Sequence, residues 1–180
     1  MSIFEPEGLW EAVRERMESP GAIGWLLLIP IVGALAVAIA VEMGVRVFTT
    51  EWNAVLGYSA RPDHDGARLR LLWVSLALAP FVQAAAGLLI LPLYGRRRHA
   101  RAALAVAVVG TMPLYAAGLS LVLLPGIIVV LVAFFVSFAW WTTGACQLLE
   151  VPRGDGAEFV TVTVMAASSA LFLCSTALPF

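Results

Sequence analysis

Few side chains in this sequence could perform chemistry, and most of them lie outside its apolar stretches. Asp63, His64 and Asp65 follow one another and could hold a metal ion weakly through their carboxylate and imidazole groups. Because this segment is rich in turn-forming residues, we expect the three side chains to be solvated. We therefore predict no metal site there.

Polar side chains within apolar stretches are costly in a membrane and are the first candidates for a function. Gln83 lies in the middle of a long apolar run and is the deepest polar side chain of its size. We interpret it as a partner in a hydrogen bond between helices, with contact to a ligand as the alternative. Glu42 and Arg46 stand four residues apart beyond another run. This spacing predicts an interfacial ion pair or, alternatively, a polar site at the mouth of a pathway.

Cofactor chemistry has little support in the sequence. Cys146 and Cys174 lie in apolar runs without a nearby cysteine or histidine, so we expect them to act as small hydrophobic groups. His64 and His99 fall in or beside loops, whereas a b-type haem requires two facing mid-span histidines. We predict no catalytic residue, no cofactor and no metal.

The densest group of charges is the loop Gly95–Arg101, which contains Arg96, Arg97, Arg98 and Arg101. Such a cluster attracts anionic lipid headgroups with about 1 kcal/mol per arginine near the surface. It is also the ordinary anchor that keeps a loop on the cytoplasmic side. We predict that these four arginines contact lipid headgroups or a partner protein.

The composition indicates which elements must position these residues. Hydrophobic residues make up 61% of the 180-residue chain, charged residues make up 13%, and the mean hydropathy is +0.92. Soluble domains contain about 45–50% apolar and about 25% charged residues. These values exclude a soluble enzyme, a disordered chain and a secreted disulfide scaffold. A net charge of −1 also argues against a nucleic acid as the partner.

The apolar stretches supply roughly five membrane spans, since a spanning helix needs about 20 mostly apolar residues. The sequence therefore predicts an all-α integral membrane protein, a bundle of five transmembrane helices with a short N-terminal amphipathic interfacial helix. We assign residues 1–20 to an N-terminal cytoplasmic amphipathic segment and residues 21–180 to the five-helix transmembrane domain. The predicted spans are 21–41, 71–94, 102–124, 126–149 and 159–178.

The N-terminal segment has an apolar stripe at helical spacing, formed by Leu9, Trp10, Val13 and Met17. This pattern predicts a helix that lies in the membrane interface. The opposite face is acidic, so attraction to anionic lipids does not explain the helix. The stripe docks either on the bundle or on a partner protein, and we assign it as a partner-facing surface.

Small residues and prolines recur within the spans. Pairs of small residues four apart let helix backbones approach closely in lipid. They are Ala36 with Ala40, Ala133 with Ser137, and Ala166 with Ala170. Each of Pro30, Pro80, Pro92 and Pro113 removes a backbone hydrogen bond, which we expect neighbouring helices to compensate.

The distribution of arginines predicts the orientation. The N-terminal tail and the loops 95–101 and 150–158 hold seven arginines, whereas the connection after the first span and its edge hold four. Loops richer in arginine remain in the cytoplasm. We therefore predict a cytoplasmic N-terminus and an external C-terminus.

Several turn and packing signals follow in a set order along the chain. They are Ser19-Pro20 before the first span, Gly95 with its basic stretch, Met112-Pro113-Leu114, Leu124-Pro125-Gly126, Gly144 and Val151-Pro152-Arg153-Gly154-Asp155. This order resembles the bacterial branch of the Yip-domain family (Ypt-interacting proteins), most strongly from Gly95 to Val164. The tyrosine and serine that often precede the third-span proline are replaced here by Gly110, Thr111 and Met112.

The resemblance implies five spans, a cytoplasmic N-terminus, a bacterial inner membrane and no enzymatic activity. Eukaryotic relatives bind small GTPases and act in membrane traffic, and we do not carry that partner over to this chain. We predict a non-enzymatic scaffold or accessory subunit that binds other membrane proteins, with membrane lipids and further copies of the chain as additional partners. The alternative is a small permease or channel for a neutral solute that acts as an oligomer, supported by the proline-containing helices and Gln83.

Overall fold

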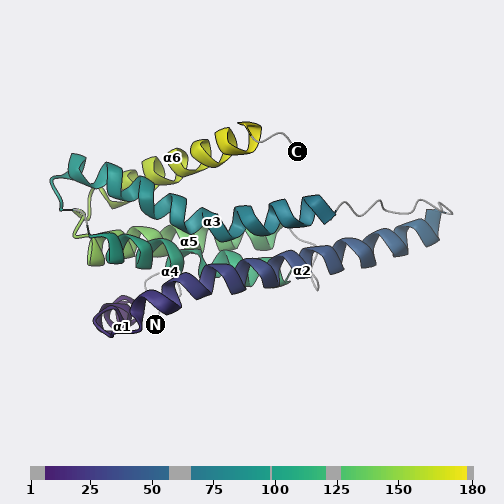
Figure 1. Ribbon diagram of the computed structural model, residues 1–180, viewed down its shortest axis with the longest axis horizontal. Coiled ribbons are helices and arrows are strands. Elements are labelled where there is room, and N and C mark those ends of the chain that lie inside the picture. The colour runs from purple at the N-terminus through teal and green to yellow at the C-terminus, as the bar shows by residue number, and fades with distance from the viewer. Residues whose placement is uncertain (1–6, 57–65, 98, 121–126, 178–180) are drawn as a thin grey trace.

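The computed structural model describes residues 7–56, 66–97, 99–120 and 127–177, and the elements in these ranges are helical (Figure 1). They are α1 (Glu7–Met17), α2 (Ala22–Leu56), α3 (Gly66–Ile90), the 3-10 helix η1 (Leu91–Tyr94), α4 (Ala100–Ser120), α5 (Ile127–Leu148) and α6 (Gly156–Ala177). The long helices run lengthwise, and α1 lies across one end of the bundle (Figure 1). The predicted all-α architecture is confirmed.

Five of the described helices are long and apolar enough to cross a membrane. Their spanning segments are Ala22–Val41, Trp73–Tyr94, Ala100–Ser120, Ile128–Leu148 and Gly156–Leu173. Each overlaps one predicted span. The turn predicted at Pro125-Gly126 lies outside the described residues, but the helices on either side of it, α4 and α5, pack against each other.

The first two spanning helices are longer than the sequence predicts. The predicted spans end at residue 41 and resume at residue 71, whereas α2 continues to Leu56 and α3 begins at Gly66. At 1.5 Å per residue the 35 residues of α2 reach about 52 Å, beyond the hydrocarbon core of about 30 Å. Accordingly, α2 projects past the other helices at the end opposite α1 (Figure 1). Hydropathy marks where the membrane ends, and a helix can continue into water beyond that point.

The central helix is α4. Of its spanning segment 67% is buried, compared with at most 33% for each other span. It packs against α2, α3 and α5. Many of its buried residues are small, among them Ala103, Ala105, Ala107 and Gly110. Neighbouring backbones can therefore approach it closely, and such close packing drives helix association in lipid.

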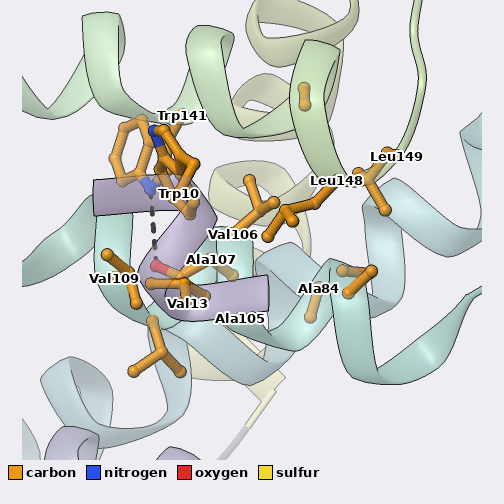
Figure 2. Packing of buried hydrophobic residues seen from close by; sticks show 14 of the residues in the cluster. Trp10, Val13, Ala84, Ala105, Val106, Ala107, Val109, Trp141, Leu148 and Leu149 are labelled. Atoms are coloured by element: carbon orange, nitrogen blue, oxygen red, sulfur yellow. Dashed lines mark hydrogen bonds between the residues drawn. The ribbon is translucent and has the colours of Figure 1, made fainter. Parts of the chain in front are cut away.

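Aromatic rings pack directly on glycines at three contacts between helices. The pairs are Trp141 on Gly110, Tyr115 on Gly33 and Trp10 on Gly144. A Cβ atom at Gly110 would lie 1.9 Å from Cδ1 of Trp141, and at the other two glycines the nearest ring carbon would lie at 2.8 and 2.7 Å. Figure 2 shows Trp10 and Trp141 together in the main core. These contacts require glycine because any side chain would displace the ring.

A proline in α3 explains the position of Tyr115. Pro80 has no N–H, so the carbonyl of Leu76, four residues earlier, loses its helical donor. The hydroxyl of Tyr115 on α4 donates to that carbonyl at 3.0 Å. The same ring rests on Gly33 of α2. One side chain therefore joins three helices and satisfies a backbone group that lipid cannot satisfy.

The contact between Gly110 and Trp141 gives a test of this packing. In Gly110→Ala the indole of Trp141 must move, and it also donates from Nε1 to the carbonyl of Ala107 at 3.4 Å. Overpacking of a core costs about 1–3 kcal/mol, so we expect thermal unfolding in detergent about 2–12 °C below wild type.

The matched control for this variant is Gly24→Ala, which adds the same methyl group to α2 with no neighbour within 4 Å. Alanine is favoured over glycine inside a helix by about 0.5–1 kcal/mol, so this variant should unfold at or above the wild-type temperature. Equal unfolding temperatures for the two variants would contradict the packing described above.

Candidate functional site

The predicted functional side chains that the structure describes lie in two regions of the bundle. One is the end that carries α1, and the other is the interior between α3, α4, α5 and α6. At the first, Trp10 is fully buried and Val13 is 7% exposed, both within the main core. Leu9 and Met17 are half-buried against the same core.

This placement corrects the assignment of the N-terminal stripe as a partner-facing surface. The stripe packs on the chain's own bundle, where α1 contacts α2, α4 and α5. The ring of Trp10 rests on Gly144, near the end of α5. The sequence identified the apolar face correctly, but its spacing contains no information about which surface covers it.

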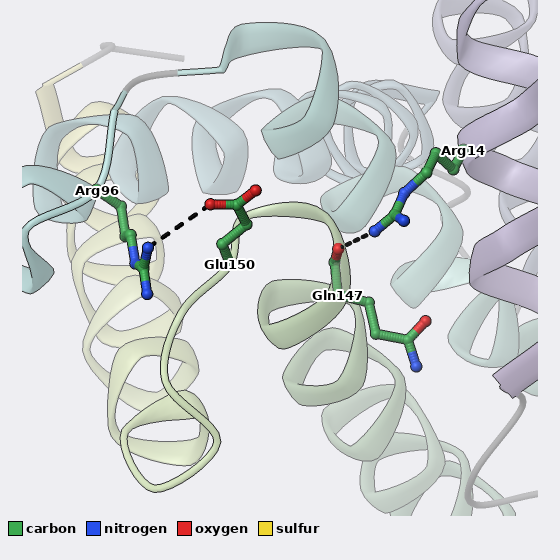
Figure 3. A network of polar contacts seen from close by, with 4 residues as sticks. All are labelled: Arg14, Arg96, Gln147 and Glu150. Atoms are coloured by element: carbon green, nitrogen blue, oxygen red, sulfur yellow. Dashed lines mark hydrogen bonds and ion pairs between the residues drawn. The ribbon is translucent and has the colours of Figure 1, made fainter.

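Arg14 completes the attachment of α1. Its guanidinium Nη2 donates to the backbone carbonyl of Gln147 in the last turn of α5 (Figure 3). The last four carbonyls of a helix lack donors within the helix and carry partial negative charge, so a cation stabilises them. The N-terminal helix therefore caps the C-terminal end of α5.

The basic loop begins at the same end with a tight turn after η1. Gly95 has a φ of +70°, the left-handed conformation that favours glycine. Its N–H bonds to the carbonyl of Pro92, and the N–H of Arg96 bonds to the carbonyl of Leu91. This pair of bonds is the Schellman arrangement, which ends a helix and turns the chain toward α4.

The predicted arginine cluster is only partly available to a ligand. Arg96 forms an ion pair with Glu150, with 3.6 Å between Nη1 and Oε2 (Figure 3). Arg97 and Arg101 are exposed. Arg98 lies outside the described residues. Of the four predicted contacts with lipid headgroups or a partner, Arg97 and Arg101 are therefore the best placed.

Tyr94 connects this end of the bundle to α6. Its hydroxyl donates to Oε1 of Glu158 at 3.3 Å, and its ring meets that of Phe159 edge-on with 5.5 Å between centroids. Glu158 lies in the first turn of α6, where a carboxylate interacts favourably with the helix dipole. Polar contacts thus connect α1 to α5 and η1 to α6 at one end.

Gln83 lies where two hollows in the bundle interior meet. The larger hollow has a volume of about 220 Å³ and reaches Leu76 and Leu171. The smaller has a volume of about 20 Å³ and reaches Gly87 and Phe159. Within the described part of the chain, the amide of Gln83 makes no hydrogen bond to another helix. Gln83 therefore lies where it could contact a bound ligand, which is the alternative to a hydrogen bond between helices.

Two buried hydroxyls, those of Ser137 on α5 and Thr163 on α6, have no hydrogen-bond partner among the described residues. Thr163 lines the smaller hollow together with Gln83. Trp141 lines both hollows. The sequence analysis does not identify Thr163 or Trp141 as a candidate site residue. No sequence signal distinguishes either one, because only the packing of the helices orients them.

The predicted ion pair of Glu42 and Arg46 lies on the part of α2 beyond the membrane span. Glu42 and Arg46 are both within α2, and their side chains lie outside the described residues. The ion pair between them stays a prediction. Asp63, His64 and Asp65 also lie outside the described residues.

Comparisons with known proteins add no assignment, since no protein-family model, no curated protein and no solved structure matches this chain. The resemblance to the Yip-domain family therefore rests on the sequence features alone and stays a prediction.

The attachment of α1 can be tested by removing its buried ring. Trp10→Ala leaves the surface of Gly144 uncovered, and loss of a buried tryptophan costs about 3–5 kcal/mol. We expect the amide protons of α1 to lose protection in hydrogen exchange, and trypsin to cleave after Arg14 and Arg16 about tenfold faster or more. Glu11→Ala, on the exposed face of α1, should behave as wild type. Unchanged cleavage in Trp10→Ala would show that Trp10 does not hold the helix.

Proposed function

We propose that this chain is a non-enzymatic accessory subunit or scaffold that binds another integral membrane protein through the outer face of α6. The observation that carries the proposal is a row of exposed residues, named here the outer stripe. It consists of Val162, Met165, Ala166, Ser169 and Ala170. These positions repeat at three- and four-residue intervals and therefore lie on one face of the helix.

The outer stripe differs from the small-residue pairs in the other helices. Ala40, Ala133 and Ser137 are buried inside the bundle, and Ala36 is half-buried. Ala166 and Ala170 are exposed although they have the same spacing. Small residues at this spacing favour close contact between helix backbones, and no helix of this chain supplies that contact on the described outer face.

Other outward faces of the bundle carry bulky side chains. Ile31, Leu35 and Ile39 are 44–47% exposed on α2, and Leu131 and Phe135 are 50% and 65% exposed on α5. Such faces suit lipid tails, which fill the space around branched and aromatic groups. The outer stripe contains Met165, and the same face of α6 continues to the exposed Phe172 and Leu173, but its centre at Ala166, Ser169 and Ala170 is small. This small centre suits a neighbouring helix better than lipid tails.

Ser169 adds a polar argument for the same partner. Its exposed hydroxyl makes no hydrogen bond within the described residues, whereas Thr161 on the same helix bonds to the carbonyl of Ala157 at 2.8 Å. A hydroxyl without a partner in hydrocarbon is unfavourable. A helix packed on the outer stripe would supply an acceptor.

The proposed orientation places α1 and the basic loop in the cytoplasm of a bacterial inner membrane. In support, Arg14, Arg16, Arg97, Arg101 and Arg153 are all exposed, and the elements that carry them meet at one end of the bundle (Figure 1). The positive-inside rule favours that end as the cytoplasmic one.

The docking role predicts a stoichiometric membrane partner. The tagged protein is extracted from its native membrane in mild detergent and analysed by native mass spectrometry. We expect a heteromeric complex, and we expect Ala166→Leu combined with Ala170→Leu to lower the recovered partner by about tenfold or more, because the added side chains separate the helix backbones.

The control is Ala85→Leu combined with Ala116→Leu, which adds the same side chains at exposed positions of α3 and α4. Equal partner loss in both double variants would contradict a docking role for α6. Recovery of a lone monomer or homo-oligomer would contradict the accessory role and favour the permease for a neutral solute, which flux into liposomes would then measure.

The orientation predicts the labelling of a cysteine at position 100. In a background with Cys146→Ala and Cys174→Ala, Ala100→Cys should react with a membrane-impermeant maleimide only after the cells are permeabilised. Ala60→Cys, in the predicted outer connection, should react in intact cells. The opposite pattern would invert the proposed topology.

A further inference from the structure

The larger hollow near Gln83 is a cavity between α3, α4, α5 and α6. Its volume is about 220 Å³, and its wall is mostly apolar and aromatic, including Leu76, Tyr115, Phe134 and Trp141. No charged side chain lines it among the described residues. An ion would be unpaired in this low-dielectric interior, so the cavity favours a neutral molecule.

Two polar side chains, Gln83 and Thr163, lie where the cavity meets the smaller hollow, and Thr111, Tyr115 and Ser168 line the cavity itself. Gln83 lines both hollows and carries a hydrogen-bond donor and an acceptor. Thr163 lines the smaller hollow, is 4% exposed, and its Oγ1 has no partner within the described residues. The buried hydroxyl and the amide are therefore both available to a ligand.

Thr163 differs in this respect from four other threonines of the bundle. Thr111, Thr142, Thr143 and Thr161 each donate to the carbonyl four residues earlier in their own helix, at 2.6–2.9 Å. In a helix this bond is the usual way to satisfy a threonine hydroxyl. The missing bond at Thr163 therefore points to an acceptor or donor outside its helix.

We propose that the cavity binds a small neutral amphiphile, a ring or short chain with one hydroxyl or carbonyl group. The polar group lies between Gln83 and Thr163, and the apolar body extends along Phe134, Val164 and Leu171. The size is adequate, because apolar cavities of roughly 150 Å³ already admit benzene. A lipid tail fits the apolar wall but has no hydrogen-bonding group that could pair with Gln83 or Thr163. This site does not depend on the docking role of the outer stripe.

The test uses the full-length protein in phosphatidylcholine nanodiscs and the photoreactive alcohol azioctanol, an octanol that carries a diazirine. After irradiation, mass spectrometry maps the labelled residues. We expect labelling of Phe134, Val164 or Leu171 that unlabelled octanol competes away. The matched azioctane, which lacks the hydroxyl, should label these residues about fivefold to tenfold less, the loss expected for one hydrogen bond.

Two variants test the polar groups. Gln83→Leu should reduce labelling by azioctanol about fivefold to tenfold and remove its advantage over azioctane. Thr163→Val keeps the shape of the side chain and should act in the same direction. Ala85→Leu, exposed on α3, is the control and should label as wild type.

Two results would overturn the proposal. Equal competable labelling by both probes, unaffected by Gln83→Leu and Thr163→Val, would make the cavity a groove for lipid tails. An absence of competable labelling in the wild-type cavity would leave it without an amphiphile, with water as the partner of the two polar groups.

Discussion

The close approach of the other helices to α4 is the constraint on which this bundle depends. In lipid, apolar side chains gain nothing by leaving their solvent, so helices associate through packing and hydrogen bonds. α4 presents alanine and glycine to α2, α3 and α5, and its span is the most buried of the five. The aromatic residues pack onto the glycines of this arrangement. Rings packed against backbone therefore contribute to helix contact here, beside the aliphatic side chains of the main core.

Two of the three rings, Tyr115 and Trp141, also donate hydrogen bonds to backbone carbonyls. Tyr115 donates to the carbonyl that Pro80 leaves without a donor, and Trp141 donates to the carbonyl of Ala107. Arg14 does the same for the last turn of α5. Each of these side chains bonds the backbone of a helix other than its own. Packing and hydrogen bonding are therefore coupled, since displacing a ring from its glycine also removes its bond.

The sequence predicts the spans well because hydropathy is a local property of each segment. It does not predict the lengths of α2 and α3, since polar residues outside the membrane continue a helix as readily as they form a loop. It also does not predict which surface covers Trp10 and Val13, because one amphipathic face can dock on any apolar surface. The position of Gln83 in the middle of an apolar stretch predicted that it lies at membrane depth. The cavity beside it depends on four helices and could not be predicted from one segment.

The small-residue pairs show most clearly what sequence spacing leaves undetermined. Three pairs have the same four-residue separation, yet most members of two are buried within the bundle and those of the third, Ala166 and Ala170, are exposed. Identical local patterns thus have different neighbours, and only the fold separates them. The small residues of α4 already pack against α2, α3 and α5. No helix of the described chain packs on the exposed small residues of α6. An unmatched surface for close helix contact, with Ser169 at its centre, favours a second membrane protein as its neighbour over lipid alone.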